Sequence, residues 1–309
     1  MRVMREYLEL RVREAYSDLV FRKDEGTILD KRVRLVKLDA SDPRMSAICA
    51  AHMELRPKGE SLFWGWRLVR KYEQREIATA KVLRLLVTKT TPSGDEYGTV
   101  YDESGACPYR FTEVEIEIPQ VKARLDVICG TGARQVSELV LDFRKIAKAV
   151  DLASSRAHEV VISAQVATQL DASGISGYKL LPVFDCNAQL ARALQRPGPE
   201  SRVLKQLQIT SQSVRVTQNT RFGINPCDPD GVGRYKCPFG HVLGLNILSE
   251  VEVIKSDWDG SDIFRTKEFF GYCSQPYRPG PAILITPRMH QFLQANRVKG
   301  YRVEVAHFV

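Results

Sequence analysis

With 309 residues, the chain is long enough for one large domain or two ordinary ones, and its 44% hydrophobic and 27% charged residues are ordinary for a globular protein. This composition excludes an intrinsically disordered chain, and no apolar run reaches the ~18 to 20 residues of a membrane helix. The net charge of +8 comes from Lys and Arg residues that are spread along the chain beside acidic ones, which is typical of a solvated surface rather than of a concentrated nucleic-acid-binding block.

The first half of the chain, 1-150, predicts a β-rich N-terminal domain. Apolar and polar residues alternate up to about Lys37, which predicts strands joined by a turn. Further along, the pattern predicts a strand at Phe63–Leu68, then one or two helical turns, then a strand at Val82–Val87. Residues 111–128 alternate strongly on both sides of a Pro-Gln break, so we expect a hairpin there.

The second half, 151-309, predicts an α+β domain in which one strand-helix-strand pattern occurs twice, at a constant offset of 123 residues. In each copy a β-branched run is followed by a hydroxyl residue at the N-cap position, Ser163 or Thr286, and then by a short helix. Gly177 and Gly300 open the second strand of each copy. We interpret the pattern as an internal duplication that serves as scaffold. The alternative is that strand-helix-strand units look alike in unrelated proteins.

Seven cysteines make an odd number, and the first residues of the chain lack the apolar stretch of a signal peptide. We therefore expect a cytoplasmic protein without a membrane partner and without a disulfide framework. The cysteines are then available for metal binding or for plain burial. They are Cys49, Cys107, Cys129, Cys186, Cys227, Cys237 and Cys273, of which we assign Cys49, Cys186 and Cys273 to structure.

One group of residues predicts a metal site. The segment Cys237-Pro238-Phe239-Gly240-His241 has the compact form of a metal knuckle, in which a tight turn brings two ligands toward one ion. A structural zinc needs four ligands, and Cys107 and Cys129 supply the second pair, because the hairpin predicted between them places its two ends about 5 Å apart. We predict a Cys3His zinc site of Cys107, Cys129, Cys237 and His241 that joins the two halves of the chain. The alternatives are that these residues are simply buried, or that Cys227 replaces one ligand.

Signals of an enzyme are weak. The sequence has no P-loop, no Rossmann glycine fingerprint, no HExxH and no GxSxG motif. A catalytic zinc keeps an open coordination position, whereas a site with three thiolates is typically closed. We therefore expect a protein that is not an enzyme. The acidic pair Asp102 and Glu103 leaves open an enzyme that acts through these carboxylates and a metal.

A family resemblance rests on the same residues. The stretch Gly98–Ser104, continued by Ala106–Tyr109 and resumed at Cys129, resembles bacterial proteins in which a CPxCG knuckle is unbroken. The segments Cys237–His241 and Ile285–Tyr301 are similar to the second knuckle and the closing unit of that group. From about residue 96 onward, the chain thus resembles the double-CXXCG proteins of myxobacteria and the related immunity proteins of polymorphic toxin systems.

Two departures from that family stand out. An insertion splits the first knuckle, so the family pattern does not by itself establish Cys107 as a ligand. Gly240 stands where a double-CXXCG protein has its second cysteine. His241 would then replace the missing thiolate.

The resemblance implies a cytoplasmic, non-enzymatic immunity protein, one that neutralises a cognate protein toxin by binding it, with zinc stabilising the fold. Connecting loops often carry function, so we expect the binding surface in residues 110–128 and in a loop predicted at 221–234. The alternative is a zinc-ribbon nucleic-acid-binding protein, which the basic charge and the knuckles favour. The expected architecture is α+β, with two sheet-based halves held by one structural zinc.

Overall fold

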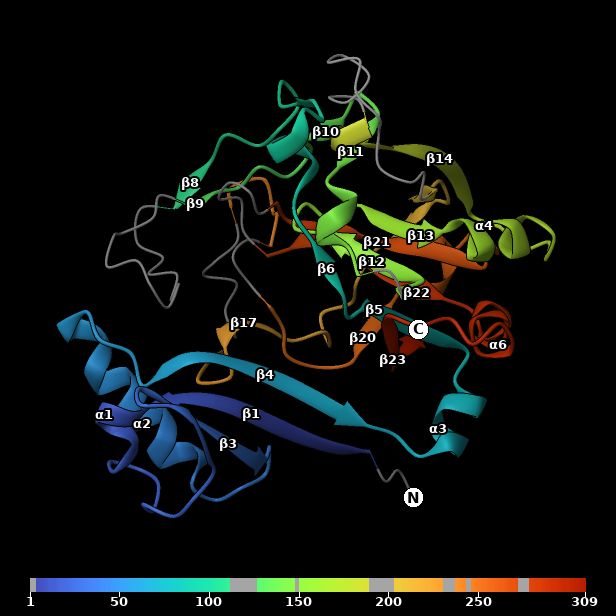
Figure 1. The fold of residues 1–309 in the computed structure, drawn as a ribbon. Coiled ribbons are helices and arrows are strands. Elements are labelled where there is room, and N and C mark those ends of the chain that lie inside the picture. Colours follow the sequence, from blue (N-terminus) through green and yellow to red (C-terminus); the bar gives the residue numbers. More distant parts are fainter. Residues whose placement is uncertain are drawn as a thin grey trace.

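The computed structural model describes residues 4–111, 127–147, 150–188, 203–229, 237–242, 246–271 and 278–309. The fold is mixed α/β, and its strands outweigh its helices. A four-stranded N-terminal sheet lies beside a larger body that contains two six-stranded sheets (Figure 1). None of the helices in the described ranges combines the length and the apolar character that a bilayer crossing requires.

The N-terminal sheet is antiparallel, with the strand order β2-β3-β1-β4. Its strands are β1 (Arg5–Arg13), β2 (Thr27–Asp30), β3 (Val33–Asp39) and β4 (Phe63–Lys71), and the short helical segments around it are α1 (Glu14–Ser17), η1 (Arg56–Lys58) and α3 (Gln74–Thr79). Leu8, Leu10 and Val12 of β1 are buried and share one hydrophobic cluster with Ile48 of helix α2 (Met45–Leu55). The alternation predicted strands here because every second side chain points to the same face.

The two six-stranded sheets combine strands from both sides of residue 150, where we expected a domain boundary. The first has the order β16 (Ser213–Val214), β21 (Ile263–Phe270), β22 (Gly280–Ile285), β5 (Val82–Val87), β23 (Tyr301–Phe308) and β20 (Val251–Val253). The second has the order β11 (Leu139–Leu141), β14 (Tyr178–Asp185), β15 (Leu204–Ile209), β13 (Val160–Ser163), β12 (Leu152–Ser155) and β6 (Thr90–Thr91). Strand β5 pairs antiparallel with both β22 and β23. Strand pairing therefore does not divide at residue 150.

The remaining strands of the described ranges form smaller sheets. They are β7 (Tyr101–Asp102) with β10 (Arg134–Gln135), β8 (Arg110–Phe111) with β9 (Val127–Ile128), and β18 (Asp228–Pro229), β17 (Phe222–Asn225) and β19 (Asn246–Ile247) in that order. Short 3-10 turns lie at η2 (Gly94–Tyr97), η3 (Phe143–Lys145) and η4 (Lys255–Asp257). The segment 221–234, predicted as a loop, therefore begins with a hairpin, and its residues 230–234 lie outside the described ranges.

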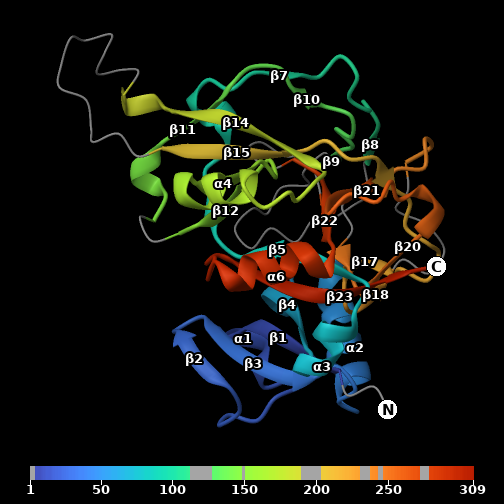
Figure 2. The ribbon, with the colours of Figure 1, turned by 90° about the vertical axis from the view of Figure 1, so that its right-hand side faces the viewer.

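Each predicted strand-helix-strand pattern is present as such in the fold. Helix α4 (Ala164–Asp171) connects β13 to β14, and helix α6 (Pro287–Ala295) connects β22 to β23. In both cases the two strands flank a third strand that is antiparallel to them, β15 in one sheet and β5 in the other. The two helices lie at the same side of the body (Figures 1 and 2). Side chains of both helices meet in one hydrophobic cluster.

Each unit contacts the strand that precedes the other unit, β12 in one sheet and β21 in the other. The Leu152 amide donates to the Lys299 carbonyl at 3.0 Å, and the Ile263 amide donates to the Ser176 carbonyl at 3.1 Å. In both places the next residue is a glycine with positive φ, Gly300 at 104° and Gly177 at 96°. A Cβ on either glycine would lie 2.1 Å from a carbonyl oxygen of that strand, Ile263 for Gly177 and Leu152 for Gly300. Only glycine permits this approach of the two backbones.

The N-cap of α4 gives a first testable prediction. The Ser163 hydroxyl accepts a hydrogen bond from the Val166 amide at 3.4 Å and so satisfies one amide at the start of the helix. We expect Ser163→Ala to reduce the free energy of unfolding by about 1 kcal/mol. Thr168→Ala is the matched control, because the Thr168 hydroxyl bonds only the Ala164 carbonyl within the same helix. Calorimetric melting of both variants checks the prediction, and equal losses would contradict the cap.

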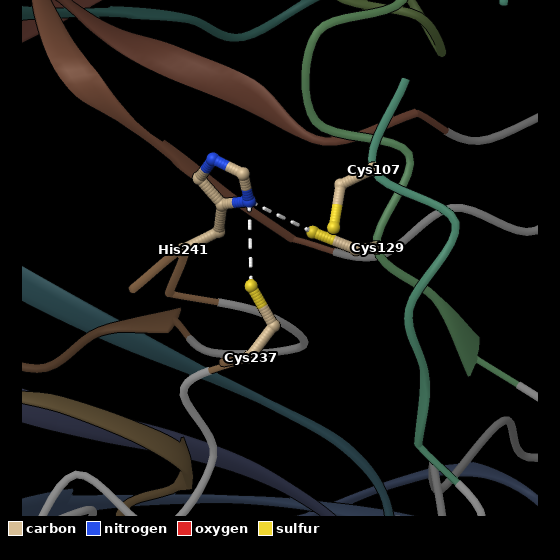
Figure 3. A group of neighbouring side chains, drawn as sticks. All are labelled: Cys107, Cys129, Cys237 and His241. Atoms are coloured by element: carbon tan, nitrogen blue, oxygen red, sulfur yellow. Dashed lines mark hydrogen bonds between the residues drawn. The ribbon is translucent and has the colours of Figure 1, made fainter. Parts of the chain in front are cut away.

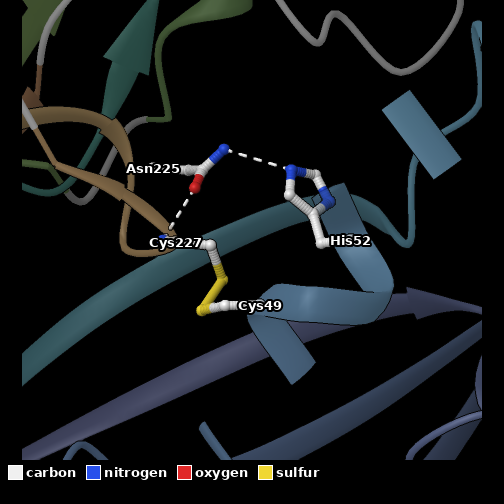
Figure 4. The surroundings of a disulfide bond; sticks show 4 residues. All are labelled: Cys49, His52, Asn225 and Cys227. Carbon is white, nitrogen blue, oxygen red and sulfur yellow. Dashed lines mark hydrogen bonds between the residues drawn. A yellow bond between two sulfur atoms is a disulfide. The ribbon is translucent and has the colours of Figure 1, made fainter. Parts of the chain in front are cut away.

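A disulfide joins Cys49 of α2 to Cys227, in the β17–β18 turn, with a Cα–Cα distance of 4.9 Å (Figure 4). The prediction of no disulfide was therefore wrong, and Cys227 is not a substitute metal ligand. The turn is further fixed by the Asn225 side chain, which accepts from the Cys227 amide at 2.8 Å and contacts buried His52 at 3.3 Å. The ion pair of Arg56 with Asp228, 2.8 Å long, adds a second link between the same two segments.

Candidate metal centre

The four predicted ligands converge in the fold. Cys107 precedes β8, Cys129 follows β9, and Cys237 and His241 come from a turn more than 100 residues later. Their three sulfur atoms and one ring nitrogen lie within 4.8 Å of one another (Figure 3). The three cysteines are buried, at 7%, 0% and 3% exposure for Cys107, Cys129 and Cys237. The arrangement can hold one metal ion.

The ends of an inserted hairpin bring Cys107 and Cys129 together. Strands β8 and β9 pair antiparallel, so the chain returns to its starting point before it reaches Cys129. The Gly130 amide donates to the Cys107 carbonyl at 3.0 Å, and the Cys129 amide donates to the Tyr109 carbonyl at 2.8 Å. The pairing predicted for the two ends is therefore confirmed, while residues 112–126 of the predicted hairpin lie outside the described residues.

A tight turn positions the second ligand pair. The Cys237 amide donates to the His241 carbonyl at 3.0 Å, and the Gly240 amide donates to the Cys237 carbonyl at 2.8 Å. Gly240 has a φ of 82°, a conformation that a cysteine would adopt only with strain. The next residue places the His241 Nδ1 atom 3.3 Å from the Cys237 sulfur and 3.5 Å from the Cys129 sulfur. His241 thus places a potential ligand atom in the group, which position 240 does not.

The loop after Cys129 packs tightly on the loop before Cys107. The Cys107 amide donates to the Thr131 carbonyl at 2.8 Å. Gly132 has a φ of 104°, and a Cβ there would lie 2.5 Å from the Gly105 carbonyl oxygen. Gly132 therefore permits this close approach of two backbone segments.

Burial makes the cluster costly for free thiolates. It raises the pKa of the Cys129 thiol to about 12, while the Thr131 hydroxyl acts in the opposite direction. A bound cation favours the thiolate form instead, because it supplies the opposite charge that the buried surroundings lack.

A second small group was not found by the sequence reasoning. Carboxylate oxygens of Asp142 and Asp185 lie within 4.8 Å of the Cys186 sulfur. Asn187 donates to both carboxylates, at 2.8 and 3.0 Å, and hydrogen bonds led by the Arg144 guanidinium lower the pKa of Asp142 to about 2. Both Asp142 oxygens and one Asp185 oxygen thus already accept hydrogen bonds from protein groups. Cys273 lies outside the described residues.

The acidic pair considered for an enzyme is engaged in ion pairs. Asp102 accepts from the Ser104 amide at 2.9 Å and faces Arg134 at 3.6 Å, and these hydrogen bonds, first of all from Ser104, lower its pKa. Glu103 pairs with Arg278 at 2.7 Å. In the described part of the chain, neither carboxylate belongs to the group of potential metal ligands formed by Cys107, Cys129, Cys237 and His241.

In comparisons with known proteins, no family model and no curated protein matches this chain.

Proposed function

We propose that Cys107, Cys129, Cys237 and His241 bind one zinc ion as a structural site, and that the chain is a non-enzymatic immunity protein. The observation that carries the proposal is the convergence of these four ligands from two distant segments. Zinc would join the hairpin that carries Cys107 and Cys129 to the later turn, and so stabilise the fold that binds a partner.

The distances support zinc. Tetrahedral zinc has Zn–S bonds of about 2.3 Å and Zn–N bonds of about 2.0 Å, which place a sulfur and a nitrogen ligand about 3.5 Å apart. The His241 nitrogen lies 3.3 and 3.5 Å from two of the sulfurs. Three thiolates and one imidazole also match the softness that zinc prefers over magnesium or calcium.

The ligand set supports a structural rather than a catalytic role. Four protein ligands complete a tetrahedron and leave no position for water or substrate. The three cysteines are buried, which restricts access to the ion. An activity through an open metal position therefore finds no support in this geometry.

The scaffold supports a binding role. We propose that the two strand-helix-strand units arose by internal duplication, on the basis of their equal topology and the matching contact of each unit with the strand that precedes the other. Together with the resemblance to immunity proteins, this favours a chain that covers a toxin by direct protein–protein contact. The cognate toxin is then the expected partner.

Co-expression tests the immunity function. Cells that express a candidate toxin, chosen from proteins encoded beside this chain's gene, should survive only when the chain is present. The two proteins should also elute together from a size-exclusion column. A chain that neither protects nor co-elutes with any such toxin would contradict the proposal. The zinc site is tested separately by metal analysis.

One observation favours nucleic-acid binding as a second candidate function. Arg11, Lys37, Arg67 and Lys71 are exposed on the face of the N-terminal sheet opposite α2. Glu9 on the same face pairs with Arg67 at 2.5 Å and with Lys37 at 4.0 Å, so Arg11 and Lys71 contribute most of the unpaired positive charge among these four. The ammonium groups of Lys37 and Lys71 lie 4.9 and 5.6 Å from the centre of the Tyr7 ring, between them. Fluorescence anisotropy with labelled oligothymidine measures whether the chain binds nucleic acid and so distinguishes this function from immunity. Tight binding that falls at least a hundredfold between about 50 and 200 mM salt would support this function over immunity.

A further inference from the structure

A cavity of about 690 Å³ is lined by strands of both six-stranded sheets. Leu85 and Ile283 of the first sheet and Leu207 and Val160 of the second line it, together with the loop that follows Cys129. Pockets of 300 to 1,000 Å³ with mostly apolar walls are typical of small-molecule sites. The cavity is therefore large enough for a small organic ligand.

Arg265 of β21 brings a positive charge to this cavity. It is half-buried, and its neighbour across the strand pair, Ile283, also lines the cavity. Within the described ranges, its side chain forms neither a hydrogen bond nor an ion pair. A guanidinium that loses part of its water without a protein partner is costly, and an anionic ligand would offset that cost.

The other arginines near Arg265 differ, because acidic side chains already neutralise them. Arg278 pairs with Glu103 at 2.7 Å and stacks over the Tyr101 ring at 4.1 Å. Arg134 is 76% exposed and faces Asp102 at 3.6 Å. The fourth lining arginine, Arg84, pairs with Glu304 at 3.3 Å. Among the four lining arginines of the described structure, Arg265 alone has no acidic partner and is left for a ligand.

The acidic residue of the cavity lining, Glu159, does not neutralise the positive charge of Arg265. Glu159 is the one acidic residue among the described lining residues, and it is 8% exposed. Its carboxyl group accepts hydrogen bonds from the Tyr101 and Ser155 hydroxyls. Burial raises the pKa of Glu159, which favours its neutral form. The cavity thus keeps a net positive character.

We propose that this cavity binds a small organic molecule that carries a phosphate or carboxylate group, and that Arg265 contacts that group. Arg265 holds the anionic end, and the apolar walls from both sheets enclose the rest of the molecule. None of the four proposed metal ligands lines this cavity, although the loop that follows Cys129 does, and the proposal does not depend on the immunity function.

Calorimetric titration tests the site with two probes, inorganic pyrophosphate and citrate, at constant ionic strength. We expect at least one probe to bind the full-length protein, and Arg265→Gln to weaken that binding tenfold or more, because a charge-assisted contact is lost. Arg265→Lys should retain part of the affinity. Lys267→Gln is the matched control, since it removes one positive charge from the same strand at an exposed residue that does not line the cavity.

Three results would overturn the inference. Neither probe binds the native chain, Arg265→Gln binds both probes as tightly as the native chain, or Lys267→Gln weakens binding as much as Arg265→Gln. The last result would indicate attraction by the general surface charge instead. Pyrophosphate binding alone indicates a phosphate ligand, and citrate binding alone indicates a carboxylate ligand. Thermal melting of each variant confirms that the comparison is made on folded protein.

Discussion

Protein purified without added metal is expected to contain about one zinc ion per chain, and the Cys237→Ser variant is expected to contain none. Cys237 contributes one of four ligands that lie within 4.8 Å of one another, and serine oxygen is a poor replacement for a thiolate in a buried site. Because the ligands belong to segments far apart in the sequence, the binding energy of zinc contributes to the folding energy. Mass spectrometry of metals, with melting curves, measures both effects.

The loss of stability should be large. At a free zinc concentration a thousand times its dissociation constant, binding stabilises the folded state by about 4 kcal/mol. Cys186→Ser is the control, because Cys186 is a free cysteine outside the Cys3His cluster. It should keep both the metal and the melting temperature. A metal-free native chain, with Cys237→Ser equally stable, would rule out the zinc site.

The second large effect is expected where each strand-helix-strand unit meets the strand that precedes the other unit. We expect Gly177→Ala and Gly300→Ala each to destabilise the fold by more than about 3 kcal/mol, since a methyl group would overlap a backbone carbonyl of a strand rather than a flexible side chain. The overlapping atoms are the Ile263 oxygen for Gly177 and the Leu152 oxygen for Gly300, each at 2.1 Å. Chemical unfolding of the two variants measures the loss.

A third glycine separates the overlap from backbone strain. Gly260 has a φ of 88°, close to that of Gly177, but a Cβ there would meet nothing within 4 Å. Gly260→Ala should therefore cost only the strain of an L-residue at positive φ, about 1 kcal/mol. If all three variants lost the same stability, the close approach of Gly177 and Gly300 to the strands β21 and β12 would not be the cause.

The candidate metal site was predictable because its chemistry restricts the choice. Few residue types bind zinc, and Cys237 and His241 stand close enough in the sequence to suggest a turn. The pair Cys107 and Cys129 followed from one assumption, a hairpin between them, and the pairing of β8 with β9 confirms its two ends. In contrast, Cys49 and Cys227 are 178 residues apart, and no local pattern indicates that α2 and the β17–β18 turn meet.

Short-range sequence patterns also determined which strands and helices were predicted correctly. Strand β5 was predicted with its correct ends from a β-branched and leucine-rich run. Helix α2 was missed, although Asp42 and Pro43 stand just before it and are a sequence signal for a helix start. The Asp42 carboxylate accepts from the Arg44 amide at 2.9 Å, while the N-cap residue Arg44 itself makes no side-chain capping bond. The sheet to which β5 belongs could not be predicted either, since its partners β22 and β23 lie about 200 residues later.

The position of β5 has a consequence for synthesis of the chain on the ribosome. The N-terminal sheet has all of its strands within the first 71 residues, so it can form early. Strand β5 emerges directly afterwards with both edges unpaired, and it waits for about 200 further residues before β22 and β23 exist. At ~5 to 20 residues per second, this interval lasts roughly 10 to 40 seconds. During that time β5 exposes an apolar strand with two open edges, which makes the nascent chain a candidate for chaperone protection.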